Sequence, residues 1–185
     1  MTINLTIGCM FSGKTSWLIN IAKMNMIIDK KVLIINFEND KRYSSNKIVT
    51  HSGDELDCFF CEKDINFVKC IEGYLESDII CINEGQFFEN LTDFCLTSSR
   101  EGKEVYVSGL DGDYLQRPFG EILNLIPHCD YVNKIHAFCV MCKNGTKASF
   151  TKRIAKSDDL ILIGGKEKYL PVCRNCLDKQ FKDWW

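Results

Sequence analysis

The sequence is poor in proline, in histidine and in net charge. Only three of its 185 residues are proline, which argues against a disordered chain. Lys and Arg total 23 against 25 Asp and Glu, and a net charge of −2 provides no electrostatic footprint for nucleic-acid binding. No apolar run approaches the roughly 18 residues of a membrane span, and the first residues lack the pattern of a secretory signal. We therefore expect a cytoplasmic protein with neither a nucleic-acid nor a membrane partner.

Cysteine, in contrast, is abundant. The chain has eleven cysteines, an odd number. Without a secretory signal they indicate a reducing compartment and metal ligation rather than a disulfide framework. The apolar fraction of 45% is enough for a sizeable core, and the length suits one domain, alone or with a small appended module.

The phosphate-binding pattern G-x-x-x-x-G-K-[ST] is matched by Gly8-Cys9-Met10-Phe11-Ser12-Gly13-Lys14-Thr15. A strand is expected before it, at residues 3–7, and a helix after it, with an apolar stripe at Trp17, Ile21, Met24 and Ile28. Gly8 and Gly13 allow the loop to turn its N–H groups onto phosphate oxygens, Lys14 can reach the β- and γ-phosphates, and Thr15 offers a hydroxyl to Mg²⁺. The alternative is a chance match in a glycine-containing turn, which the flanking strand and helix disfavour. The sequence predicts a nucleoside-triphosphate site.

Strand-like and helix-like segments alternate four times. Further strands are expected at residues 32–37, 79–82 and 105–107, and further helices at 64–75 and 91–100. The first of these helices is expected to bury Ile65, Val68, Ile71 and Leu75. The alternation predicts an α/β fold, with a mostly parallel sheet flanked by helices.

Two segments stand outside this alternation. Residues 38–55 are polar and aperiodic, which indicates a long functional loop. After Pro127 a strand at 131–138 leads into a segment of different character. We therefore predict a nucleotide-binding domain at residues 1–136 and a small Cys-rich module at 137–185.

A functional carboxylate is expected after the strand at 79–82. Phosphate-loop enzymes usually place an Asp at such a strand end to help hold Mg²⁺, and here that position is Asn83. Glu84 follows at the edge of the sheet where α/β proteins bind ligands, so it is a candidate base for an acceptor hydroxyl. The alternative is a solvated surface glutamate.

Two C-x₂-C pairs, Cys139/Cys142 and Cys173/Cys176, lie 30 residues apart in the Cys-rich module. Four thiolates in two such turns can enclose a structural, tetrahedral Zn²⁺. Cys58/Cys61 is a competing pair, for which a place in or beside the core is favoured. The other cysteines are expected to act as small hydrophobic residues, namely Cys9, Cys70, Cys81, Cys95 and Cys129. The position of Cys9 also raises the hypothesis of oxidation sensitivity.

Several motifs together resemble the type II thymidine kinases, the cytosolic and poxvirus-type enzymes. They span nearly the whole chain: the phosphate loop, Glu84-Gly85-Gln86-Phe87-Phe88, Leu110-Asp111-Gly112, Arg117-Pro118-Phe119-Gly120, Phe150-Thr151-Lys152-Arg153, Ile163-Gly164-Gly165 with Lys168-Tyr169, and the four cysteines of the two pairs. Two positions depart from that family, since Asn83 replaces its Asp and Tyr114 its usual Phe.

The resemblance implies an enzyme that phosphorylates the 5′-hydroxyl of thymidine with ATP and Mg²⁺, using Glu84 as base. It implies a zinc-bearing lasso loop that closes over the nucleoside, and an arginine near the phosphates at Arg42. The implied nucleoside contacts are Met10, Phe87, Leu110, Tyr114, Phe119, Thr151, Leu160, Ile163 and Tyr169. It further implies feedback inhibition by dTTP and a homo-oligomer, commonly a tetramer.

The residues alone leave other interpretations open. On general grounds the aromatic side chains at 114–119 suit a core better than a ligand platform. Gly164-Gly165 suits a hairpin turn, and Lys152-Arg153 suits a solvated face. Three other functions compete: a kinase for another deoxynucleoside, a phosphate-loop ATPase whose zinc ribbon binds nucleic acid or protein, and a catalytically weak regulatory homologue.

Overall fold

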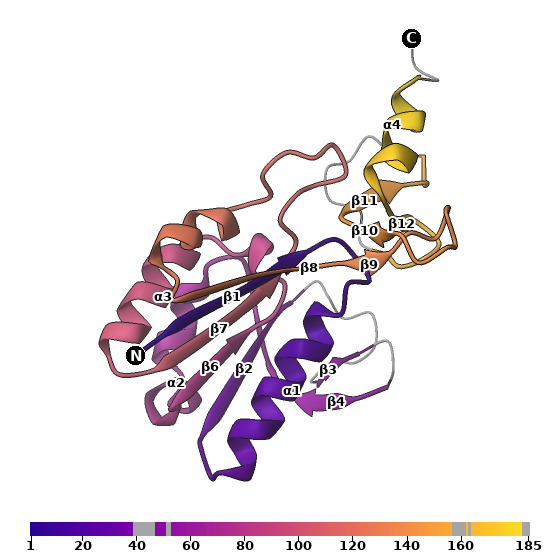
Figure 1. The fold of residues 1–185 in the computed structure, drawn as a ribbon. Coiled ribbons are helices and arrows are strands. Elements are labelled where there is room, and N and C mark those ends of the chain that lie inside the picture. The colour runs from indigo at the N-terminus through magenta and orange to yellow at the C-terminus, as the bar shows by residue number, and fades with distance from the viewer. Residues whose placement is uncertain (39–46, 51–52, 157–161, 163, 183–185) are drawn as a thin grey trace.

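The computed structural model describes residues 1–38, 47–50, 53–156, 162 and 164–182. A six-stranded sheet lies at its centre with the order β5-β2-β6-β7-β1-β8, and every pairing within it is parallel (Figure 1). Its strands are β1 (Ile3–Gly8), β2 (Val32–Phe37), β5 (Phe59–Cys61), β6 (Ile79–Ile82), β7 (Glu104–Gly109) and β8 (Tyr131–Ile135). The predicted α/β class with a mostly parallel sheet is confirmed.

Successive side chains of each strand point to opposite faces of the sheet, so each face packs against different helices. Ile34 and Ile79 belong to the cluster that packs against the first helix. Ile35 and Ile80 belong to the larger cluster on the opposite face. The covering helices are α1 (Lys14–Ile27) on the first face, and α3 (Leu91–Arg100) with the 3₁₀ helix η3 (Ile122–His128) on the second.

The apolar stripe predicted for α1 is wrong. Met24 and Ile28 are exposed, and the remaining two members are only half-buried. The buried apolar residues are instead Leu18, Ile19 and Ala22. Apolar residues lie on every side of this helix, so their spacing does not identify the face that packs on the sheet.

The single helix predicted at 64–75 is two short ones, η1 (Ile65–Cys70) and α2 (Glu72–Glu76). Ile71 separates them with an extended backbone, φ −89° and ψ 146°. Leu75 is consequently 70% exposed, and Tyr74 is buried in its place, where its hydroxyl lies 3.0 Å from the Oγ of Ser98 on α3.

The expected loop at 38–55 contains ordered structure. Lys47–Val49 (β3) and Glu55–Asp57 (β4) form an antiparallel hairpin, and Ile48 is buried within the cluster that packs on α1. Cys58 precedes β5, an edge strand of the sheet, and Cys61 is its last residue and is buried in the core as favoured.

The C-terminal segment forms a compact unit beyond the carboxyl ends of β1 and β8 (Figure 1). The predicted strand at 131–138 divides at His136 into β8 and β9, and β9 opens this unit. Its elements are β9 (Ala137–Phe138), β10 (Lys147–Ala148), β11 (Phe150–Arg153), β12 (Tyr169–Val172) and α4 (Arg174–Lys182). Its small core also receives the side chain of Cys9 from the phosphate loop. None of the helices in the described ranges is long and apolar enough to span a membrane.

Candidate active site

The strand register brings polar residues together at the carboxyl edge of the sheet. Ile35 pairs with Ile82, and Ile82 pairs with Val107. The residue that follows each of these three is polar, so three buried side chains lie side by side on the α1 face: Asn36, Asn83 and Ser108. Ligands of open α/β sheets bind at this edge, and the principal pocket among the described residues opens here.

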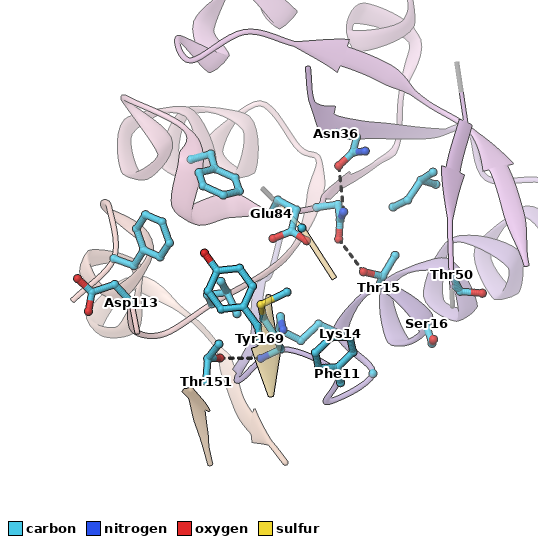
Figure 2. A pocket seen from close by; sticks show the side chains of 18 of the residues that line it. Phe11, Lys14, Thr15, Ser16, Asn36, Thr50, Glu84, Asp113, Thr151 and Tyr169 are labelled. Atoms are coloured by element: carbon cyan, nitrogen blue, oxygen red, sulfur yellow. Dashed lines mark hydrogen bonds between the residues drawn. The ribbon is translucent and has the colours of Figure 1, made fainter. Parts of the chain in front are cut away.

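Asn83 is the centre of a buried hydrogen-bond network. Its Nδ2 donates to the Oδ1 of Asn36 across 2.9 Å. Its Oδ1 accepts from the hydroxyls of Ser108 at 3.1 Å and Thr15 at 3.4 Å. Figure 2 shows this chain of contacts from Asn36 to Thr15 at the rim of the pocket. Asn83 therefore connects the end of β6 to the first turn of α1.

The phosphate loop has the backbone that its sequence pattern requires. Gly13 adopts the left-handed region, with φ 91°, and α1 begins at the next residue without a side-chain cap. Because no side chain caps the helix, its positive N-terminal end is presented to an anion. The Nζ of Lys14 donates to the carbonyl of Cys9 across 2.7 Å, and the N–H of Met10 donates to the Oγ1 of Thr151 across 3.0 Å. The loop is thus held partly by the C-terminal unit.

Glu84 lies directly after β6 with left-handed backbone angles, φ 54° and ψ 41°. This conformation is uncommon for a residue with a side chain. It directs the carboxylate into the space shared by Lys14, Thr15 and the ring of Tyr169 (Figure 2). The alternative of a solvated surface glutamate does not describe this half-buried, pocket-lining side chain.

An aromatic and apolar wall closes the opposite side of the pocket. The rings of Phe87 and Phe119 meet edge to face, with 5.4 Å between their centroids, and Phe87 stacks on Phe37 at 4.8 Å. Leu110 and Tyr114 line the same pocket from the segment after β7. The aromatic residues at 114–119 therefore face a cavity rather than filling a core.

Arg153 also lines this pocket, although the sequence pattern suited a solvated face. Only 6% of it is exposed. Its guanidinium carbon lies 3.7 Å from the centre of the Tyr114 ring, and its Nη2 donates to the hydroxyl of Tyr169 across 2.9 Å. That hydroxyl in turn donates to the carbonyl of Leu162 across 2.8 Å. A buried cation thus fixes two aromatic rings of the wall.

The structure brings most of the predicted site residues together. Those that line the pocket are Met10, Phe11, Gly13, Lys14, Thr15, Glu84, Phe87, Leu110, Tyr114, Phe119, Thr151 and Tyr169. Gly8, Cys9 and Ser12 belong to the loop but not to the lining. Arg42, Leu160 and Ile163 lie outside the described residues.

Other lining residues were not predicted. Asn36, Asp113 and Arg153 are polar or charged residues among them, and the β3 hairpin adds Lys47, Ile48 and Val49. The sequence of β2 does not identify Asn36 as a site residue. A polar residue within an apolar run can be assigned to a site only when the order of the strands in the sheet is known.

The cysteines outside the two C-x₂-C pairs divide by environment. Cys9 is 2% exposed, its Sγ donates to the carbonyl of Ala148 across 3.3 Å, and burial raises the pKa of its thiol. This environment argues against the hypothesis that Cys9 is sensitive to oxidation, because the reactive thiolate is disfavoured. Cys81 and Cys95 are buried, as predicted, but Cys70 is exposed and the prediction for it is wrong.

The four predicted zinc ligands converge in the C-terminal unit. The Sγ atoms of Cys139, Cys142, Cys173 and Cys176 all lie within 4.8 Å of one another. The Sγ of Cys142 is 3.7 Å from that of Cys173 and 3.5 Å from that of Cys176. Bonds of about 2.3 Å to a tetrahedral metal place sulfur atoms roughly 3.8 Å apart, so the group fits Zn²⁺. Burial raises the pKa of the Cys139 thiol, but the N–H groups of Cys173, Cys142 and Met141 outweigh it and bring the pKa to about 6.

Comparison with known proteins agrees with this geometry. The family model described as Thymidine kinase matches residues 1–177. The thymidine kinase of Yaba monkey tumor virus is 40% identical over 96% of this chain and 94% of its own length. Thymidine kinase 1 of Dictyostelium discoideum is 38% identical over 94% of this chain and 76% of its own length. The thymidine kinase of Vaccinia virus (strain Western Reserve) is 37% identical over 94% of this chain and 95% of its own length. This chain belongs to the thymidine kinase family.

Proposed function

We propose that this chain transfers the γ-phosphoryl group of ATP to the 5′-hydroxyl of thymidine, giving dTMP and ADP, with Glu84 as the general base. The observation that supports it is a single pocket that contains the phosphate loop, the Glu84 carboxylate and the aromatic wall. Phosphoryl transfer needs a phosphate site, a group that accepts the hydroxyl proton and a platform for the acceptor, and these three requirements meet there.

The phosphate groups of ATP would be held by Gly8, Cys9, Met10, Phe11, Ser12, Gly13, Lys14 and Thr15, with Arg42 as a further cation. The uncapped start of α1 and the Lys14 ammonium suit the negative charge of the triphosphate. Mg²⁺ would neutralise charge on the phosphates. Thr15 Oγ1 and Asn83 Oδ1 are neutral oxygen atoms of the kind that Mg²⁺ accepts, and they lie 3.4 Å apart at the edge of the loop.

The Glu84 carboxylate would accept the proton of the 5′-hydroxyl as that oxygen bonds to the γ-phosphorus and the bond to ADP breaks. A carboxylate placed at the acceptor contributes general-base catalysis, while Lys14 and the loop N–H groups stabilise charge on the transferred group. Catalysis of this kind depends on positioning, because little covalent chemistry falls to the protein.

The thymine base would lie against Met10, Phe87, Leu110, Tyr114, Phe119 and Tyr169. Backbone groups near Thr151, Leu160 and Ile163 would hydrogen-bond its edge. The C-terminal unit contributes Thr151, Arg153 and Tyr169 to the pocket, so a structural Zn²⁺ on its four cysteines would stabilise the segment that covers the nucleoside.

Family membership also motivates three proposals about the whole protein: a homo-tetramer, feedback inhibition by dTTP, and a cytoplasmic location. The first can be tested by light scattering. The second can be tested by titrating dTTP into a steady-state assay.

The test of the proposed function is a nucleoside panel with ATP and Mg²⁺, in which monophosphate formation is measured for thymidine, deoxyuridine, deoxycytidine and a purine deoxynucleoside. We expect thymidine to give the highest kcat/KM. Faster turnover of another nucleoside would identify a different substrate. ATP hydrolysis that no nucleoside stimulates, with salt-dependent retention on DNA, would instead support a nucleic-acid-binding ATPase.

A further inference from the structure

Gln86 is a buried residue of the active site to which the proposed mechanism gives no role. It lies two positions after Glu84, is 2% exposed, and its side-chain amide is hydrogen-bonded at both ends. The Nε2 donates to the Oε2 of Glu84 across 2.7 Å. The Oε1 accepts from the backbone N–H of Leu110 across 2.9 Å. One amide thus joins the carboxylate to the first residue of the nucleoside wall.

Two glycines lie close to Gln86, one against its side chain and one against its backbone. A Cβ on Gly109 would lie 2.4 Å from its Oε1, and a Cβ on Gly120 would lie 2.1 Å from its backbone carbonyl. Both glycines therefore allow the chain to approach Gln86 more closely than any other residue type would. Gly109 thus lies against the side-chain amide of Gln86, and Gly120 lies against its backbone.

We propose that Gln86 is a positioning residue. It holds the Glu84 carboxylate at the acceptor hydroxyl and fixes its position relative to Leu110. The proposal rests on the role of Glu84 as base. An amide suits this place, because it donates to a carboxylate and accepts from an N–H while remaining neutral. The pocket beside Gln86 is lined, among the described residues, by Glu84 and by four further charged side chains, Lys14, Lys47, Asp113 and Arg153. The neutral amide of Gln86 adds no charge to this set.

Two substitutions separate the two hydrogen bonds. Gln86→Met keeps the approximate volume and removes both bonds, so the carboxylate loses its orientation. Gln86→Glu keeps an acceptor for Leu110 but loses the donor and places a second carboxylate beside Glu84. Like charges disfavour ionisation, so the pKa of the base rises, and the acid limb of the kcat–pH profile moves to higher pH.

The experiment measures kcat, both KM values, Tm and the kcat–pH profile for the wild type, the two Gln86 variants, Glu84→Gln, and the exposed-residue control Gln116→Met. We expect kcat to fall at least tenfold in Gln86→Met with KM for ATP unchanged, and the acid limb to rise by at least half a pH unit in Gln86→Glu. Gln116→Met should match the wild type.

The outcomes distinguish this inference from the function beneath it. If Glu84→Gln is inactive while both Gln86 variants keep the wild-type kcat and pH profile, Gln86 has no positioning role and the proposed base stands. A lower Tm without a change in the pH profile of Gln86→Glu also overturns the inference, because a purely structural role predicts that pattern. If Glu84→Gln turns over normally, the proposed base and the inference fail together. Should Gln86→Met not fold, the near-isosteric Gln86→Glu decides the question alone.

Discussion

The hydroxyl of Thr15 donates to the Oδ1 of Asn83 across 3.4 Å, so the first turn of α1 and the end of β6 meet through a neutral amide. A phosphate-loop enzyme usually has a carboxylate at the second of these positions. The neutral contact here depends on a partner, because Asn83 donates in turn to Asn36 across 2.9 Å. The two buried amides form one unit beside the proposed Mg²⁺ site.

Replacing Asn83 with Asp is expected to retain or raise turnover and to lower the half-saturating Mg²⁺ concentration several-fold. The carboxylate can accept from both Thr15 and Ser108, and a rotation of the Asn36 amide restores the remaining hydrogen bond. Added negative charge beside Thr15 strengthens the attraction for the cation. The measurement is the initial rate as a function of Mg²⁺ at saturating ATP and thymidine.

Ser108→Ala serves as control, since it removes a hydrogen bond to Asn83 without adding charge and should leave the Mg²⁺ dependence unchanged. A folded but inactive Asn83→Asp would show that the amide itself is required.

Replacing Cys142 with Ser is expected to remove most of the bound zinc and to impair thymidine phosphorylation. The Sγ of Cys142 lies 3.7 Å from that of Cys173 and 3.5 Å from that of Cys176. The unit that these cysteines would stabilise supplies Thr151, Arg153 and Tyr169 to the pocket. We expect the free energy of unfolding of Cys142→Ser to fall by about 2 kcal/mol, which corresponds to a fall in Tm of roughly 4–8 °C for a chain of this size. The measurements are metal content per chain, Tm and KM for thymidine.

The exposed Cys70→Ser is the matched control and should behave as the wild type. Full zinc content and unchanged Tm in Cys142→Ser would contradict the assignment.

The ring of Tyr114, rather than its hydroxyl, is expected to matter for nucleoside binding, because Arg153 packs 3.7 Å from the centre of that ring. Tyr114→Phe should keep KM for thymidine within about twofold. Tyr114→Leu should raise it about fivefold or more, since a cation–π contact of this kind is worth roughly 1–2 kcal/mol. Leu115→Ala, at an exposed neighbouring position, should have no effect. Equal losses in the Phe and Leu variants would assign the effect to the hydroxyl.

The parts of the molecule that follow local rules could be predicted from the sequence. Apolar runs in buried parallel strands identified β2 and β6. The glycine spacing of the phosphate loop predicted a phosphate site at the carboxyl end of β1. The spacing of two C-x₂-C pairs likewise predicted the convergence of four cysteines. The stripe on α1 failed because that helix is apolar on every side.

The remaining parts depend on which segments become neighbours. Asn36 acquires its role only because β2 lies beside β6 in the sheet, and local periodicity does not encode that order. Lys152 and Arg153 look alike in sequence, yet the alternation of β11 and two aromatic rings bury only the second. The hydrogen bond of Gln86 to Leu110 forms only because the segment after β7 lies beside the segment after β6.

The most direct test of the central claim is the rate of dTMP formation by Glu84→Gln at saturating ATP, Mg²⁺ and thymidine, with Tm measured to establish that the variant is folded. The amide keeps the size of the side chain but cannot accept the proton of the 5′-hydroxyl. We predict that kcat falls roughly a hundredfold or more, with a Tm close to that of the wild type. Turnover near the wild-type rate would contradict the assignment of Glu84 as the base.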